Sequence, residues 1–208
     1  MIAFEEKMRA GGGAALAEAE RFFMKNDAVH QTLRAIAPRL QAMGIDYAVV
    51  GGMALVAHGY DRTTVDVDIL VTSEGNRLLR EKLDGLGYVP PFAGSRNLRD
   101  TQTGVRIEFL ITGEFPGDGK PKPVVFPDPA HASVEIDGIR YLRLERLIEL
   151  KLASGLTNPN RLKDLADVQE LIRAIHPERE LGDRLDASVR AKYFEFWDGL
   201  AAEGPQEH

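Results

Sequence analysis

Apolar residues recur at helical spacing after residue 26, and the period changes beyond residue 44. The helical positions are Leu33, Ile36, Leu40 and Met43. Asn26 or Asp27 can cap this helix, and Gly44 can end it. The short apolar run Tyr47 to Val50 follows and predicts a buried strand.

Strands and helices alternate through most of the remaining chain. Further strands are expected at 65–71, from residue 87 and at 105–111, with a hairpin at 134–141 turning on Asp137-Gly138. Helices are expected at 53–58, 74–86, 144–154, 161–175 and 183–200. This order predicts an α+β fold. We divide the chain into an N-terminal helical arm (1–25), a core (26–142) and a C-terminal helical segment (143–208).

Composition places the chain among soluble globular proteins. Of 208 residues, 44% are hydrophobic and 28% are charged, which excludes global disorder. The absence of cysteine excludes disulfides, thiolate zinc sites, iron–sulfur clusters and thiol catalysis, and it suits a reducing compartment. Neither a signal peptide nor a membrane-spanning run is recognisable, so we expect a cytoplasmic protein without membrane contact. The net charge of −6 means that any polyanion must be bound locally.

Asp66 and Asp68 are the first candidates for chemistry. Residues two apart on a strand point to the same face, with Cα atoms about 6.5 Å apart. Two carboxylates so placed repel each other unless a cation lies between them. Oxygen ligands without thiolates or paired histidines favour Mg²⁺. An exposed strand edge or a turn is the alternative for this short motif.

Gly51, Gly52 and Glu108 extend this candidate site. The glycine pair falls between a strand and a helix, where free backbone N–H groups favour a phosphate, although a simple tight turn explains it equally well. Glu108 is the single acidic residue in an apolar strand, and a third carboxylate would allow two metal ions to be held. The alternative for Glu108 is a solvated or ion-paired strand residue.

The order of these motifs resembles the DNA polymerase β nucleotidyltransferase superfamily. Val50-Gly51-Gly52 is followed, after thirteen residues, by Asp66-Val67-Asp68-Ile69. The fuller string from Gly51 to Val71 is similar to minimal nucleotidyltransferases and type IV abortive-infection toxins, which share GG-x-A-L and an Arg-x-Thr before the carboxylates. The later segment RLIELKLASGLTNPNRLKDLADVQELI is similar to their C-terminal part. Gly52 stands where other members have Ser, and Glu108 stands where Asp is commoner.

The resemblance implies a mixed sheet flanked by helices and a nucleotidyltransferase core with a C-terminal helical segment. It also implies that Asp66 and Asp68 bind Mg²⁺, with Glu108 as third ligand or base. The implied reaction is transfer of an NMP from an NTP to an acceptor hydroxyl, on an RNA end such as tRNA, a protein or a small molecule, with release of pyrophosphate. The alternative is a catalytically inactive nucleotide-binding or interaction module of a toxin–antitoxin pair, with its cognate partner.

Several basic residues are candidates for substrate contacts. Arg62 and Lys151 could bind the triphosphate, although Lys151 could equally be a solvated helix lysine. Lys163 and Asp167 stand at i and i+4 and suit an ordinary surface pair. The Pro- and Gly-rich loop 113–130 could border the acceptor, or its cations could be solvated. The cations in or near that loop are Arg96, Arg99, Lys120 and Lys122.

Overall fold

Seven strands form one mixed sheet in the computed structural model, which describes residues 27–203. The strands are β1 (Tyr47–Val50), β2 (Asp66–Val71), β3 (Tyr88–Val89), β4 (Leu98–Asp100), β5 (Arg106–Ile111), β6 (Ser133–Ile136) and β7 (Ile139–Leu142). Their order across the sheet is β3-β4-β5-β2-β1-β7-β6. β2 pairs with β5 and β1 with β7 in parallel, and the other pairs are antiparallel. The expected mixed sheet is confirmed, while the arm at 1–25 lies outside the described residues.

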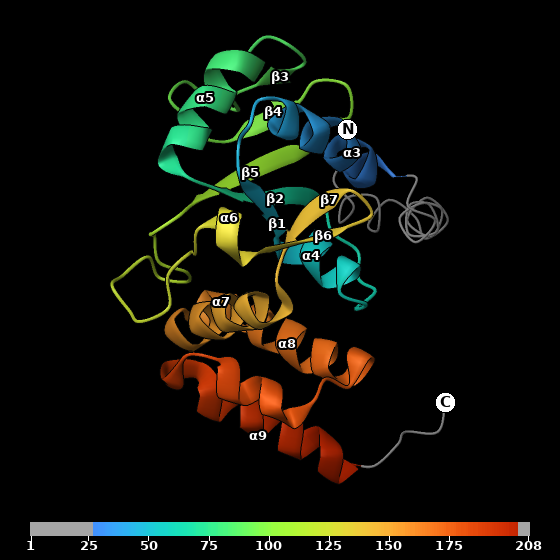
Figure 1. Ribbon diagram of the computed structural model, residues 1–208, viewed down its shortest axis with the longest axis vertical. Helices are drawn as coiled ribbons and strands as arrows, with labels where there is room; N and C mark the ends of the chain where they lie inside the picture. Colours follow the sequence, from blue (N-terminus) through green and yellow to red (C-terminus); the bar gives the residue numbers. More distant parts are fainter. Residues whose placement is uncertain (1–26, 204–208) are drawn as a thin grey trace.

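Helices lie beside and below this sheet (Figure 1). They are α3 (Ala28–Ala42), α4 (Gly51–Ala57), α5 (Ser73–Leu83), α6 (Pro129–Ala132), α7 (Leu144–Thr157), α8 (Leu162–Ile175) and α9 (Ala187–Glu203), with 3-10 turns at Pro159–Arg161 and Arg179–Arg184. In Figure 1, α3 and α5 lie near β3, β4 and β5, and the last three helices stack at the opposite end. The fold is therefore α+β, as the sequence predicts. Within residues 27–203, no helix combines the length and apolar character needed to cross a membrane.

Local sequence accounts for most element ends. The Asp27 carboxylate accepts hydrogen bonds from the backbone N–H groups of Val29 and His30 and so caps α3. Asp137 and Gly138 both adopt positive φ, 51° and 75°, which makes the tight turn between β6 and β7. Some boundaries differ from expectation: α4 begins at the glycines, α5 ends at Leu83 and not at 86, and α9 begins at Ala187 and not at 183.

One face of the central strands forms the core, and the other face is polar. The buried positions Val67 and Ile69 alternate with the partly exposed Asp66 and Asp68. β5 shows the same alternation of exposed or partly exposed and buried positions. Thr32 of α3 donates a hydrogen bond to Asp100 Oδ2 at 3.1 Å and so fixes this helix beside β4. The polar face is left free to carry chemistry.

The C-terminal helices pack closely because a glycine lies where they meet. A Cβ atom at Gly155 of α7 would lie 2.5 Å from Cγ and 2.7 Å from Cδ2 of Leu165 of α8. Even a methyl group is too large for this space, since close-packed interiors cannot absorb it without shifting a helix.

We expect Gly155→Ala to lower the free energy of unfolding by about 1–3 kcal/mol, because the new methyl group overlaps Leu165. Urea denaturation followed by circular dichroism measures this. Gly199→Ala is the matched control, because Gly199 lies in α9 and no described atom comes within 4 Å of the place its methyl group would take. It should be neutral or stabilise by up to about 1 kcal/mol. Equal effects of the two substitutions would contradict the packing argument.

Candidate functional site

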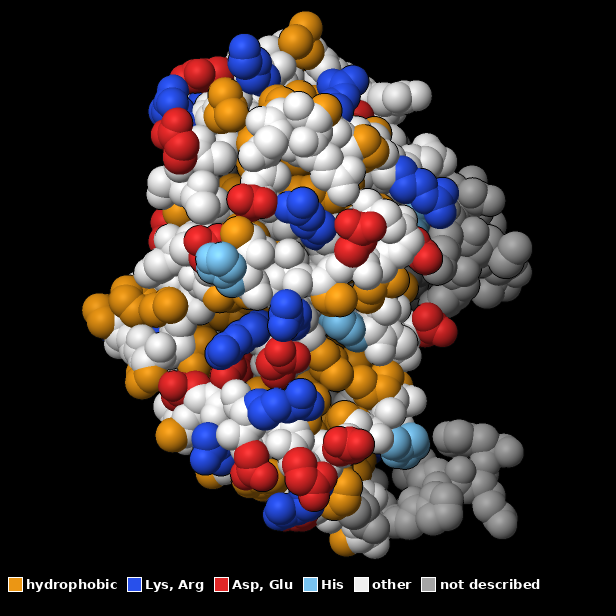
Figure 2. All heavy atoms as spheres, viewed as in Figure 1, with side chains coloured by type: hydrophobic (Ala, Val, Ile, Leu, Met, Phe, Trp, Pro, Cys, Tyr) orange, Lys and Arg blue, Asp and Glu red, His pale blue; other side chains and the backbone are white. Residues whose placement is uncertain are grey.

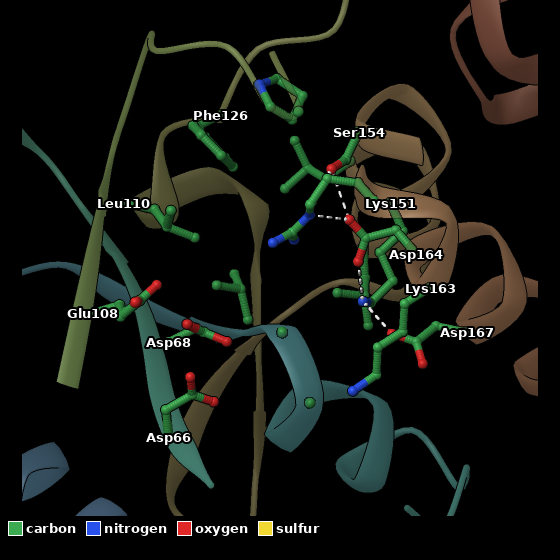
Figure 3. A pocket seen from close by; sticks show the side chains of 18 of the residues that line it. Asp66, Asp68, Glu108, Leu110, Phe126, Lys151, Ser154, Lys163, Asp164 and Asp167 are labelled. Carbon is green, nitrogen blue, oxygen red and sulfur yellow. Dashed lines mark hydrogen bonds and ion pairs between the residues drawn. The ribbon is translucent and has the colours of Figure 1, made fainter. Parts of the chain in front are cut away.

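The parallel pairing of β2 with β5 brings the acidic residues together. Asp68 lies opposite Glu108, and Asp66 lies opposite Arg106. Since residues two apart share a face of a strand, all four side chains stand on the polar face of the sheet. Figure 3 shows Asp66, Asp68 and Glu108 on one side of the pocket. The two aspartates share a face as the sequence predicts.

Gly51 and Gly52 lie directly against these carboxylates. Gly51 has φ of 62°, and a Cβ atom there would lie 2.8 Å from Asp68 Cγ. A Cβ atom at Gly52 would lie 2.8 Å from Thr64 Oγ1, and this hydroxyl donates a hydrogen bond to Asp66 Oδ1 at 3.1 Å. Both glycines are therefore required by close approach, and Thr64 orients Asp66.

The electrostatics of this group are unfavourable without a cation. Burial, and secondly the negative charge of Asp66, raises the pKa of Asp68 to about 7. Arg106 partly compensates, because its guanidinium contacts the Glu108 carboxylate and lies 4.0 Å from Asp66 Oδ2. Arg106 is half exposed, with 48% of its side-chain surface accessible. Within residues 27–203 its ion pairs are to Asp66 and Glu108, and none is to Asp68.

A divalent metal ion fits part of this donor set. Asp66 and Asp68 supply hard oxygen ligands from one face, and the raised pKa of Asp68 reflects charge that a cation would stabilise. Among the described residues, however, no three acidic, histidine or cysteine side chains lie close enough together to hold an ion as they stand. Glu108 can join the pair only by exchanging its contact with Arg106.

The carboxylates line a pocket of about 810 Å³ between the sheet and the C-terminal helices. The sheet side presents Asp66, Asp68 and Glu108, and α7 and α8 present Lys151 and Lys163 opposite them (Figure 3). Gly51, Gly52 and Arg62 also line it, so the expected carboxylates, glycines and triphosphate contacts reach one cavity. Of the cations expected at the acceptor side, Arg96 lines it, and Arg99, Lys120 and Lys122 do not. Its volume is that of a small-molecule site.

Arg62 and Lys151 are engaged by buried carboxylates. Arg62 donates two hydrogen bonds to Asp167, at 2.7 and 2.8 Å. The Lys151 amine lies 2.7 Å from Asp167 Oδ2 and 3.0 Å from Asp164 Oδ1. The expected surface pair of Lys163 with Asp167 is wrong, because Asp167 is only 5% exposed and pairs with Arg62 and Lys151 instead. This network joins α7, α8 and the segment before β2.

Asp164 shows how strongly the network is held. Burial alone would raise its pKa, but Lys151 and a 2.7 Å hydrogen bond from Ser154 keep the pKa below the ordinary value. Arg161 adds a further contact at 2.8 Å. Spacing along the sequence does not predict the contacts of Asp164 with Ser154 and Lys151, since these two residues lie on α7 and Asp164 lies on α8.

Lys163 differs from the other basic residues of the pocket. Its amine projects into the cavity from α8 (Figure 3). It is exposed, and within residues 27–203 it takes part in no ion pair. Lys163 is therefore a cation available to an anionic ligand.

The loop after β5 is tied to the end of α7. The Lys122 amine donates to Thr157 Oγ1 at 2.9 Å and to the Pro116 carbonyl at 2.6 Å. Asn158 donates to the Gly117 carbonyl at 3.1 Å. Lys122 therefore holds the loop in place, while Arg96 is paired with Glu114 at 2.7 Å.

Comparisons with known proteins give likeness of structure only. A candidate nucleotidyltransferase from H. pylori aligns with a TM-score of 0.47 and 17% identity over 86% of this chain and 96% of that chain. An antigenic nucleotidyltransferase-like protein from Paracoccidioides brasiliensis gives 0.47 and 18% over 83% and 91%. The antibiotic-resistance factor ANT(2'')-Ia gives 0.41 and 14% over 83% and 82%. No protein-family model and no curated protein matches the sequence.

We expect Lys151→Met to lower the free energy of unfolding by about 3–5 kcal/mol, because it leaves Asp164 and Asp167 buried with too little positive charge. Thermal and urea denaturation measure this. Arg77→Gln removes a surface cation paired with Glu74 and Glu81 and should change stability little. Comparable losses in both variants would refute the buried network as a main support of the helices.

Proposed function

We propose that this protein is a nucleotidyltransferase that moves a nucleoside monophosphate from an NTP to an acceptor hydroxyl. The observation that carries the proposal is the meeting of Asp66, Asp68 and Glu108 on one sheet face, in a pocket whose opposite wall presents the exposed Lys163. Acidic ligands and an available cation on opposite walls are what a metal–triphosphate substrate requires.

Asp66 and Asp68 would hold the metal, and Glu108 would complete the ligand set once it leaves Arg106. Mg²⁺ bound there supplies positive charge for the attacking and leaving oxygens. Thr64 keeps the Asp66 carboxylate oriented through its 3.1 Å hydrogen bond. Gly51 leaves room for the Asp68 carboxylate and, with Gly52, lets the phosphates approach the backbone at the start of α4.

The reaction is an in-line displacement. The acceptor oxygen forms a bond to the α-phosphorus, and the bond to the oxygen bridging the α- and β-phosphates breaks, so that pyrophosphate leaves. The alternative role for Glu108, which stands on the same face as Asp68, is that of a base that would take the proton of the acceptor hydroxyl in place of binding the metal. Lys163 faces the carboxylates and is placed to neutralise the leaving pyrophosphate.

Arg62 and Lys151 have a different part in this proposal from the one expected from sequence. Both line the pocket, but their charges are met by Asp164 and Asp167. Through these pairs they hold α7 and α8 in place beside the segment before β2, and so fix the position of Lys163 on α8. Their contribution to phosphate binding is indirect.

An inactive nucleotide-binding or interaction module is the second candidate. The contact of Arg106 with Glu108 favours it, because an arginine can replace a metal as the counter-charge of a carboxylate. Such a module would bind NTP without producing pyrophosphate.

We expect Asp68→Asn to reduce transfer by about 10³-fold or more, because metal charge stabilisation is worth several kcal/mol. Transfer of label from α-labelled NTPs with Mg²⁺ to RNA, protein or small-molecule fractions measures the activity. Circular dichroism should show an unchanged fold, since removing one of two repelling charges relieves strain. Full activity in this variant would exclude the mechanism, and bound NTP without pyrophosphate in the wild type would favour the inactive module.

Lys163→Gln should weaken NTP binding by about tenfold, the loss of one charge-assisted phosphate contact. Equilibrium binding of a non-hydrolysable NTP, with Mg²⁺ present, measures this. Lys192→Gln is a control on α9, where the lysine pairs with Glu195 away from the pocket. Unchanged NTP affinity in Lys163→Gln would show that the phosphates are bound by other residues.

A further inference from the structure

The character of the pocket changes along its length, from charged to apolar. Glu108 and Leu110 are successive partly exposed positions of β5, so they stand on one face of the sheet about 6.5 Å apart. In Figure 3, Leu110 and Phe126 lie beyond Glu108, whereas the Lys163 amine lies level with Asp66. The carboxylates therefore have a cation at one end of the pocket and apolar side chains at the other.

The loop 113–127 closes the end that lies beyond Glu108. It leaves the sheet wall after β5 and returns to it at Phe126, whose carbonyl accepts a hydrogen bond from the Gly113 N–H at 2.8 Å. Between these points it reaches the helical wall, where the Lys122 amine donates to Thr157 Oγ1 of α7 at 2.9 Å. The loop thus joins the two walls of the pocket and limits the size of a ligand at this end.

Four apolar side chains line the closed end, which we call the apolar end. Leu110 and Phe126 belong to the sheet wall and its return, and Phe115 and Pro116 belong to the loop itself. Hydrophobic side chains also gather over this loop at the left of Figure 2. Apolar lining of this kind favours a ligand part that is itself apolar, because contact removes both surfaces from water.

The cations that line the pocket near this loop offer no free charge. Arg96 donates to both carboxylate oxygens of Glu114, at 2.7 and 2.8 Å. Arg161 pairs with Asp164 at 2.8 Å. A charged group placed against Leu110 would therefore be desolvated without a partner, whereas an uncharged group loses nothing.

The in-line displacement assigns the apolar end to the acceptor. The attacking and leaving oxygens lie on opposite sides of the α-phosphorus. The proposed function directs the pyrophosphate to Lys163 and the metal to Asp66 and Asp68. The attacking oxygen then approaches from the other end of the pocket, past Glu108. The nucleoside is attached across this line and so lies off it.

We propose that the apolar end binds the acceptor, and that the acceptor is a compact, uncharged compound that carries its hydroxyl beside an apolar ring. The hydroxyl oxygen joins the α-phosphorus, its proton passes to Glu108 or to water, and pyrophosphate leaves. This inference rests on the proposed function for the identity of the reaction. Binding of the ring does not depend on turnover, and it can therefore be tested separately.

The first experiment titrates the full chain with uncharged ring alcohols, beginning with 2-naphthol, and follows binding by ligand-observed NMR. The anionic 2-naphthoate and the cationic 2-naphthylmethylammonium are the matched charged compounds. The uncharged alcohols should bind, and the charged compounds should bind about tenfold more weakly or not at all. Equal affinity for charged and uncharged rings, or no binding of any uncharged alcohol, would overturn the proposal.

Leu110→Asn should weaken binding of the ring alcohol by about tenfold, because it removes apolar contact at the floor of the apolar end. Leu86→Asn is the matched control, since Leu86 is 66% exposed and does not line the pocket. Leu110→Met should keep most of the affinity, because it preserves apolar volume. Equal effects of the asparagine substitutions at residues 110 and 86 would contradict binding at this end.

A non-hydrolysable NTP with Mg²⁺ separates the acceptor from the base of the nucleotide as the occupant. If the apolar end takes the acceptor, the ring alcohol and the NTP bind together, and neither weakens the other by more than about twofold. Displacement of the ring alcohol by the NTP would give the apolar end to the base and would overturn the proposal.

The second experiment follows label from α-labelled NTPs into RNA, protein and small-molecule fractions. Label in the small-molecule fraction that falls about tenfold in Leu110→Asn, at limiting amounts of that fraction, supports the proposal. Label on RNA or protein instead would overturn it and leave the nucleotidyltransferase assignment standing. If nothing is labelled, the proposed function fails, and the titrations alone decide whether the apolar end is a ligand site.

Discussion

The parallel register of β2 against β5 is the constraint on which the rest of the site depends. It places Glu108 beside Asp68 and Arg106 beside Asp66 on one face. On its other side β2 pairs with β1, where Val50 lies opposite Asp68, so the chain enters Gly51 beside the same carboxylate. A slip of one residue would move every polar side chain of β5 into the core, so the buried positions of both strands enforce the register.

This arrangement places charge where folding alone would avoid it. Asp68 lies on a central strand beside Asp66. Its burial, and then repulsion by the Asp66 carboxylate, raises its pKa to about 7. Gly51 and Gly52 have backbone positions that exclude a side chain, because Asp68 and Thr64 already occupy the space. Departures from ordinary folding rules that meet at one pocket are expected where a protein binds or transforms a ligand.

Local patterns predict the elements and the acidic residues, and they fail where partners are distant in sequence. Strand alternation at Asp66 and Asp68 needs only neighbouring residues, and the two share a face as expected. Asp167 instead looked like the i+4 partner of Lys163, whereas its partner Arg62 is 105 residues away. No rule based on spacing along the sequence predicts that contact. The same is true of Arg106 and Arg99, which lie side by side only because β4 pairs with β5. Local patterns therefore placed the acidic residues of the pocket better than they placed the partners of its cations.

The distinction between paired and available cations decides what the pocket can bind. Arg62 and Lys151 lie in it, yet Asp164 and Asp167 neutralise them, so counting basic residues overstates the charge offered to a substrate. Lys163 on the helical wall keeps its charge available, and Arg99 does so on the sheet face outside the cavity. Within residues 27–203, the unpaired positive charge that the pocket offers to an anion is therefore that of Lys163, on the wall opposite the carboxylates.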